Sequence, residues 1–65
     1  MSMLKKVRYV VKGTDAQGNP IRTEERQYTK AKQLAALMVR WTGNPAVVER
    51  HEYVDGTWQF KEEVL

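Results

Sequence analysis

An Asp-Gly pair at residues 55 and 56 lies between two alternating stretches, in the segment RHEYVDGTWQF. Such a pair favours a two-residue type I′ turn, because both central residues of that turn need positive φ. A two-residue turn also fixes the register of the strands on either side of it. The sequence therefore predicts a hairpin in which Tyr53 pairs with Trp58 and His51 pairs with Phe60.

Residues that pair across two strands share one face of the sheet. The predicted register therefore gathers an apolar and aromatic set on one face, which consists of Val47, His51, Tyr53, Trp58, Phe60 and Val64. We expect this set to be the half of the core that the sheet contributes. A type I turn with a bulge is the alternative, but it would place Trp58 opposite Glu52 and break the set.

The rest of the chain predicts a second hairpin and one helix. Residues 4–12 alternate as a strand, and residues 21–28 return as a more polar strand after the turn GTDAQGNP. Apolar residues then recur at helical spacing over residues 30–42. Thr29 is the expected N-cap, and Gly43 suits the left-handed position after the helix. The predicted inward stripe of the helix is Ala31, Leu34, Ala35, Met38 and Trp41, and Leu37 widens it.

These elements define an α+β fold class with the order ββαββ, in a single small domain that spans residues 1–65. The strands at residues 4–12 and 46–54 are the most apolar, so we expect them in the centre of the sheet. The sequence therefore predicts a four-stranded, mainly antiparallel sheet of order 2-1-3-4. One helix should pack on one face and leave the other face open.

The composition argues against catalysis. The chain has 65 residues and no cysteine, which excludes a disulfide framework and a thiol nucleophile. A chain this short buries too little surface for a deep pocket, and self-association is the stabilising device that remains available. Motifs for a nucleotide-binding loop, a metalloprotease or a Ser-His-acid set are absent. We therefore predict a protein that is not an enzyme and takes neither a cofactor nor a small-molecule substrate.

One cluster suggests a metal site. The predicted register pairs Glu49 with Glu62 close to His51, and two carboxylates with an imidazole could hold a divalent cation. We favour a simpler interpretation, in which His51 is a partly buried core residue hydrogen-bonded to backbone or to a glutamate and the carboxylates are solvated. The sequence-based prediction is therefore that no metal is bound.

Basic residues are concentrated in the first half of the chain. Residues 1–32 hold eight Lys and Arg against three acids, whereas residues 33–65 hold three against five. The predicted topology brings five of them to the pole where the helix begins: Lys5, Lys6, Arg26, Lys30 and Lys32. Cations beside the aromatic residues of the hairpin could bind phosphates and unstacked bases without sequence preference. Non-specific nucleic-acid binding is therefore one candidate function, and an ordinary solvated lysine surface is the simpler alternative.

The open face of the sheet is the candidate protein interface. It is predicted to carry Arg8, Val10, Lys12, Val48, Arg50 and Val54. A single-layer sheet with central valines can pack against another chain, and a net charge of only +3 favours a protein partner over a nucleic acid. The leading hypothesis is a non-enzymatic binding module that acts through protein contact, as a homodimer or with a host protein.

The sequence also carries expectations about the cell. No apolar run approaches the length of a membrane span and no signal peptide is recognisable, so we expect a cytoplasmic protein without a membrane partner. A free-standing chain of this size is often encoded by a phage or another mobile element, and we include that origin in the hypothesis.

Overall fold

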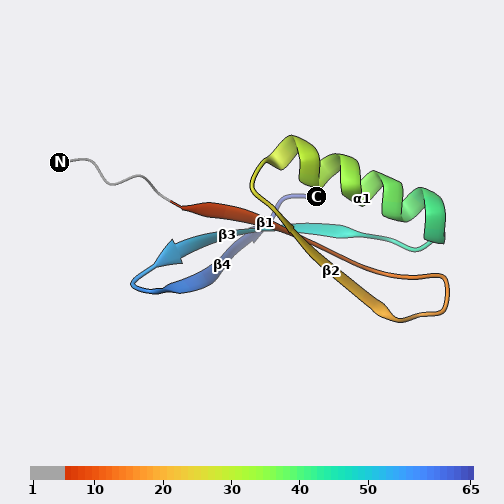
Figure 1. Ribbon diagram of the computed structural model, residues 1–65, viewed down its shortest axis with the longest axis horizontal. Coiled ribbons are helices and arrows are strands. Elements are labelled where there is room, and N and C mark those ends of the chain that lie inside the picture. The colour runs from red at the N-terminus through yellow and green to blue at the C-terminus, as the bar shows by residue number, and fades with distance from the viewer. Residues whose placement is uncertain (1–5) are drawn as a thin grey trace.

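The computed structural model describes residues 6–65, which form one sheet and one helix (Figure 1). The elements in chain order are β1 (Val7–Thr14), β2 (Pro20–Glu25), α1 (Tyr28–Thr42), β3 (Val47–Val54) and β4 (Thr57–Glu63). The sheet order is β2-β1-β3-β4, and every neighbouring pair is antiparallel. The predicted fold class and strand order are therefore confirmed.

The helix covers only one part of one face of the sheet. It packs mainly on β1, with further contacts to β2 and β3, while the β3–β4 hairpin projects beyond its first turn (Figure 1). The inner face of the helix is lined by small residues, so helix and sheet lie close together. A Cβ atom on Gly13 would lie only 3.4 Å from the Sδ atom of Met38. The buried core comprises Val11, Ala31, Ala35, Met38 and Val48.

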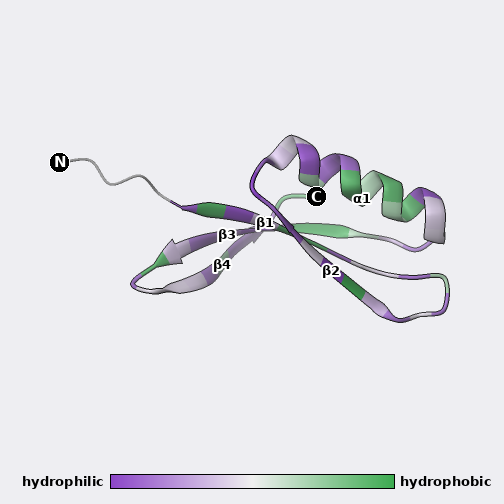
Figure 2. Ribbon diagram, viewed as in Figure 1, coloured by the Kyte–Doolittle hydropathy of each residue, from purple (hydrophilic) through white to green (hydrophobic). Residues whose placement is uncertain are grey.

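Most of the predicted core set of the second hairpin lies on the face opposite the helix, so the predicted place of these residues in the core is wrong: Val47, His51, Tyr53, Trp58 and Phe60. Val48 pairs with Val11 beneath the helix, and the alternation of β3 then turns His51 and Tyr53 to the other side. The physical reason is that Val48 fills the space beneath the helix, whereas Tyr53 and Trp58 lie on the part of the hairpin that projects beyond it. Figure 2 shows the same division, with the hydrophobic part of β3 beneath α1 and a more polar hairpin tip.

The predicted hairpin register is confirmed from the turn as far as His51 and Phe60, and it then changes. Both Asp55 and Gly56 have positive φ, as a type I′ turn requires. A bulge between Arg50 and His51 shifts the pairing by one residue, which leaves Lys61 extra in β4. Because of this shift, Val64 pairs with Val48 and not with Val47 as predicted. Val64 therefore lies on the helix side of the sheet.

The helix begins earlier than predicted, and its cap is different. Gln27 is the N-cap and makes no side-chain cap bond, whereas Thr29 lies inside the helix. Tertiary contacts explain the early start, because the ring of Tyr28 packs on Tyr9 with centroids 5.5 Å apart. Gly43 takes the expected left-handed conformation and donates its N–H to the carbonyl of Val39.

The inward stripe of the helix is narrower than predicted. Ala31, Ala35 and Met38 are buried, but Trp41 is 73 % exposed, and neither it nor the exposed Leu37 belongs to the core. Trp41 lies on the flank of the helix, about 80° from the buried stripe at 100° per residue. Within residues 6–65, no helix has the length and apolar character that crossing a membrane would require.

Candidate functional site

The open face of the sheet carries a chain of ion pairs arranged around one buried valine. Val10 is fully buried although it points away from the helix, and it lies in register between Glu24 of β2 and Glu49 of β3. Arg8 contacts Glu24 at 3.3 Å, and Lys12 contacts Glu49 at 3.1 Å. Charged side chains on all four sides therefore cover Val10 with their aliphatic stems.

His51 extends this chain of polar contacts across β3. Its Nε2 atom lies 3.0 Å from Oε1 of Glu49, and its Nδ1 atom lies 3.3 Å from Nη2 of Arg8. A guanidinium can only donate, so Nδ1 accepts, and the arrangement fits a neutral imidazole with its proton on Nε2. The hydrogen bond from His51, together with Lys12, lowers the pKa of Glu49 below its usual value. Of the two partners expected for His51, backbone or a glutamate, the structure shows a glutamate.

Three aromatic side chains, Tyr53, Trp58 and Phe60, lie beside this polar chain on the same face. Tyr53 and Trp58 meet edge to face with centroids 5.3 Å apart, and Phe60 makes a similar contact with His51. The guanidinium of Arg8 lies 4.6 Å from the centroid of the Trp58 ring. Even so, Trp58 is 36 % exposed and Phe60 is 57 % exposed. The open face therefore presents aromatic surface to solvent.

An open cleft lies where β2 separates from β1. The last pair between these strands is Tyr9 with Glu25, so the start of β1 has β3 on one side and no strand on the other. The cleft has a volume of about 910 Å³ and is lined by Lys6, Val7, Arg8, Glu24, Glu25, Arg26, Tyr53 and Trp58. Three cations and two aromatic rings thus share one concave surface with two carboxylates.

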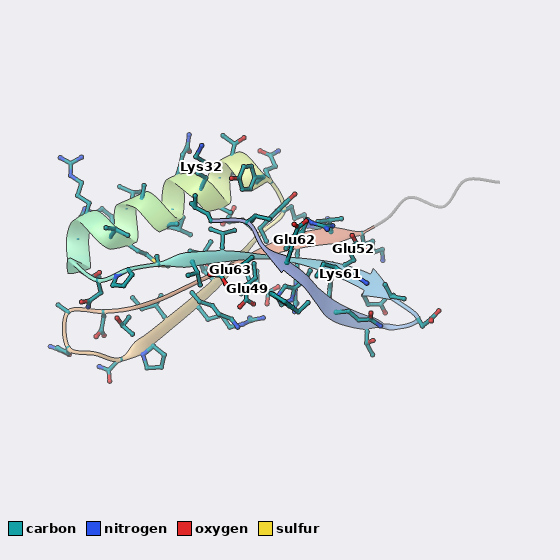
Figure 3. All side chains as sticks on the ribbon, turned by 180° about the vertical axis from the view of Figure 1, so that it is seen from behind. Lys32, Glu49, Glu52, Lys61, Glu62 and Glu63 are labelled. Carbon is teal, nitrogen blue, oxygen red and sulfur yellow. The ribbon has the colours of Figure 1, made fainter. Side chains whose placement is uncertain are left out.

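The structure brings only part of the predicted basic pole together. Lys6 and Arg26 line the cleft, and Lys6 lies 5.3 Å from the centroid of the Tyr53 ring. Lys30 lines a smaller adjoining pocket with Glu24, Glu25, Arg26 and Gln27. Lys32 lies on the helix, about 160° around its axis from Lys30 (Figure 3). Lys5 falls outside the described residues.

The predicted protein interface is divided between the two faces of the sheet. Arg8, Val10 and Lys12 lie on the open face as expected, but Val10 is buried rather than available for contact. Val48, Arg50 and Val54 lie on the helix side, so their placement on the open face is wrong. The cause is again the parity of β3, which is fixed by the pairing of Val48 with Val11.

The carboxylates considered for a metal site do not converge. The bulge places Glu63 opposite Glu49, whereas Glu62 lies opposite Arg50 on the other face (Figure 3). Glu62 lies 2.7 Å from Nη2 of Arg50, and Nη1 of the same arginine pairs with Glu52. These two carboxylates raise the pKa of Arg50 above its usual value. Among the residues that the structure describes, no three acidic or imidazole side chains form a cluster suited to a metal ion.

Sequence reasoning missed the residues that give this surface its character. Tyr53, Trp58 and Phe60 were assigned to the core, and Glu24 was given no role. The signal that could have placed them was the inner face of the helix, where the small residues Ala31 and Ala35 offer too little apolar surface to bury a large aromatic cluster. Searches against known protein families, characterised proteins and solved structures find no match to this chain.

Proposed function

We propose that the chain is a non-enzymatic binding module that acts in the cytoplasm by docking onto other protein chains, its own copies included. The observation that carries the proposal is an excess of exposed apolar side chains. Among the described residues, eight large hydrophobic side chains are each at least 36 % exposed, whereas six hydrophobic residues, two of them alanines, are buried. A domain of this size gains little stability from so small a core, and contact with another chain would add to it.

The exposed apolar residues are not scattered evenly. Tyr53, Trp58 and Phe60 form one group on the open face, and Leu37 and Trp41 form another on the flank of α1. Grouped apolar surface with a polar rim is typical of protein interfaces, and aromatic residues are enriched in their centres. The two groups lie on opposite sides of the sheet, so one chain could make two contacts.

A photo-crosslinking experiment in the host cell tests the proposal. A benzoylphenylalanine at Phe60 or at Trp41 should form covalent adducts with protein chains upon irradiation, because both positions are exposed and apolar. Gln33 is the matched control, since it lies on the outermost side of the same helix as Trp41. We expect adducts that protease removes and nuclease does not, and few from position 33.

The same experiment can contradict the proposal. Equal adduct yields from positions 33, 41 and 60 would show that the apolar groups have no docking role. Adducts from position 60 that nuclease removes would favour the second candidate function instead.

The second candidate is non-specific binding of single-stranded nucleic acid in the cleft. It is supported by the way Lys6, Arg8 and Arg26 line the same cleft as Tyr53 and Trp58. Proteins that bind single strands use cations that contact the phosphate backbone and aromatic rings on which the unpaired bases stack. Against it, Glu24 and Glu25 also line the cleft, and Arg8 already contacts Glu24.

Trp58 provides a direct measurement of nucleic-acid binding. In a Trp41→Phe background Trp58 is the sole tryptophan, so an oligothymidylate in the cleft should quench its fluorescence. Three cations limit the slope of log affinity against log salt to about −2, at roughly −0.7 per phosphate neutralised. Arg26→Glu should weaken binding, whereas Lys32→Glu, on the far flank of the helix, should not. Unchanged fluorescence at low ionic strength would eliminate this candidate.

A further inference from the structure

The outer edge of β2 offers unpaired backbone groups in a regular pattern. The N–H of Tyr53 bonds to the carbonyl of Lys6, so the even residues of β1 bond towards β3 and its odd residues towards β2. Val11 pairs with Thr23, which means that Thr23 bonds inwards and its neighbours Arg22 and Glu24 direct their N–H and C=O groups outwards. These two residues therefore form the edge that another strand could join.

The charges of this edge are self-complementary in one register. In a two-fold antiparallel pairing centred on Thr23, Arg22 lies opposite Glu24 of the second copy, and the reverse pair forms as well. If the two-fold axis passed through Arg22 instead, two arginines would lie directly opposite each other. If it passed through Glu24, two glutamates would do so. Because like charges in that position are destabilising, the centred register is the one that the edge permits.

The other edge of the sheet is less suited to pairing. The extra residue Lys61 forms a bulge in β4, and a bulge twists a strand and interrupts its row of bonding groups. The edge of β2 carries no register shift over Pro20–Glu25, and its proline lies at the end of the strand. Pro20 would face the partner only at the margin of the centred register.

The exposed flank of the helix lies above the same edge. Lys30, Leu34, Leu37 and Trp41 recur at i, i+4, i+7 and i+11, so they form one row along α1. Lys30 shares a pocket with Glu24 and Glu25, which shows that this row faces the β2 side. Leu37 and Trp41 in that row are exposed.

We propose that a second copy of the chain docks on the β2 edge, with the two β2 strands antiparallel about Thr23 and the helix flanks facing each other. The inference rests on the proposed function and names a partner for it. In this arrangement the two β1 strands lie three strand spacings apart, about 14 Å. Helices in direct contact lie only about 8–10 Å apart, so the gap needs large side chains such as Leu37 and Trp41 to fill it.

Charge reversal at the edge tests the register. Arg22→Glu places a carboxylate opposite Glu24 of the second copy in both symmetry-related pairs, and Glu24→Arg places two arginines opposite each other there. We expect each single variant to raise the dimer dissociation constant roughly tenfold or more in sedimentation equilibrium. An equimolar mixture of the two variants should form a heterodimer, because every pair across the interface is then opposite in charge. The double variant should likewise regain the dimer, and Lys61→Glu on β4 is the control that should leave it unchanged.

Trp41 gives an independent measurement. In a Trp58→Phe background, its emission should shift to shorter wavelength as the protein concentration rises, and this shift should disappear with Arg22→Glu. Circular dichroism of each variant checks that the monomer is folded.

Three outcomes would overturn the inference. A parent chain that stays monomeric at high concentration would do so, as would a dimer unaffected by either reversal, or single variants that fail to recover on mixing. None of these would remove crosslinks to other proteins from positions 41 and 60, so the proposed function would stand or fall separately.

Discussion

Val48→Glu is expected to unfold the chain. Val48 is fully buried in the centre of the sheet beneath the helix, paired with Val11. A carboxylate there would lose its hydration without gaining a cation, at a cost of several kcal/mol. A domain with so small a core has little more stability than that to lose. Far-UV circular dichroism should show no cooperative thermal transition, and the milder Val48→Ala should remain folded with a loss of about 2 kcal/mol in urea denaturation.

The neighbouring residue is the matched control. Val47 lies on the open face opposite Lys12, so Val47→Glu can form an ion pair and should change the free energy of unfolding by less than about 1 kcal/mol. If Val47→Glu unfolds the chain and Val48→Glu does not, the faces of β3 are reversed. The aromatic set would then belong to the core after all.

Local turn and strand patterns predicted the arrangement of elements, because that information is encoded by neighbouring residues. Asp55 and Gly56 determine a turn type whatever surrounds them, and Gly43 ends the helix through its own backbone conformation. Asp15 accepts hydrogen bonds from the N–H groups of Gln17 and Asn19, which orders the first turn in the same local way. The strand order followed from the relative polarity of the strands.

The faces of the sheet could not be predicted in this way, because they depend on how closely the helix packs. Across the β3–β4 hairpin, the face that includes Tyr53 carries all three aromatic residues, yet the face that includes Val48 is the one beneath Ala31 and Ala35. The bulge at Lys61 was likewise invisible, since nothing in the sequence near it distinguishes a bulged strand from a regular one. The packing of the helix on the sheet therefore determines which face of β3 is buried, and the sequence pattern alone does not.

The candidate site was predicted in composition but not in arrangement. Cations and aromatic residues were expected at the pole where the helix begins, and Lys6 and Arg26 do line a cleft with Tyr53 and Trp58. Arg8 was assigned to the separate open face of the sheet, although it also lines the cleft and so belongs to both surfaces. Its role depends on contacts with β2, β3 and β4 at once, and a pattern within one strand carries no sign of them.

Arg8→Glu is the second substitution with a large expected effect. The side chain of Arg8 is 18 % exposed and contacts Glu24, His51 and the ring of Trp58. Reversal of its charge removes all three contacts and places a carboxylate beside Glu24, so we expect a loss of about 2–4 kcal/mol in the free energy of unfolding. Arg8→Lys should lose less, because it keeps the charge and removes an Nε donor that is buried without a partner.

Arg26→Glu separates this effect from net charge. It changes the charge by the same amount at an exposed position in the same cleft, and the free energy of unfolding should change by less than about 0.5 kcal/mol. Equal losses for Arg8→Glu and Arg26→Glu would mean that overall charge, and not the contacts of Arg8, holds the open face together. A loss confined to Arg8 would show that its contacts with Glu24, His51 and the ring of Trp58 stabilise the open face.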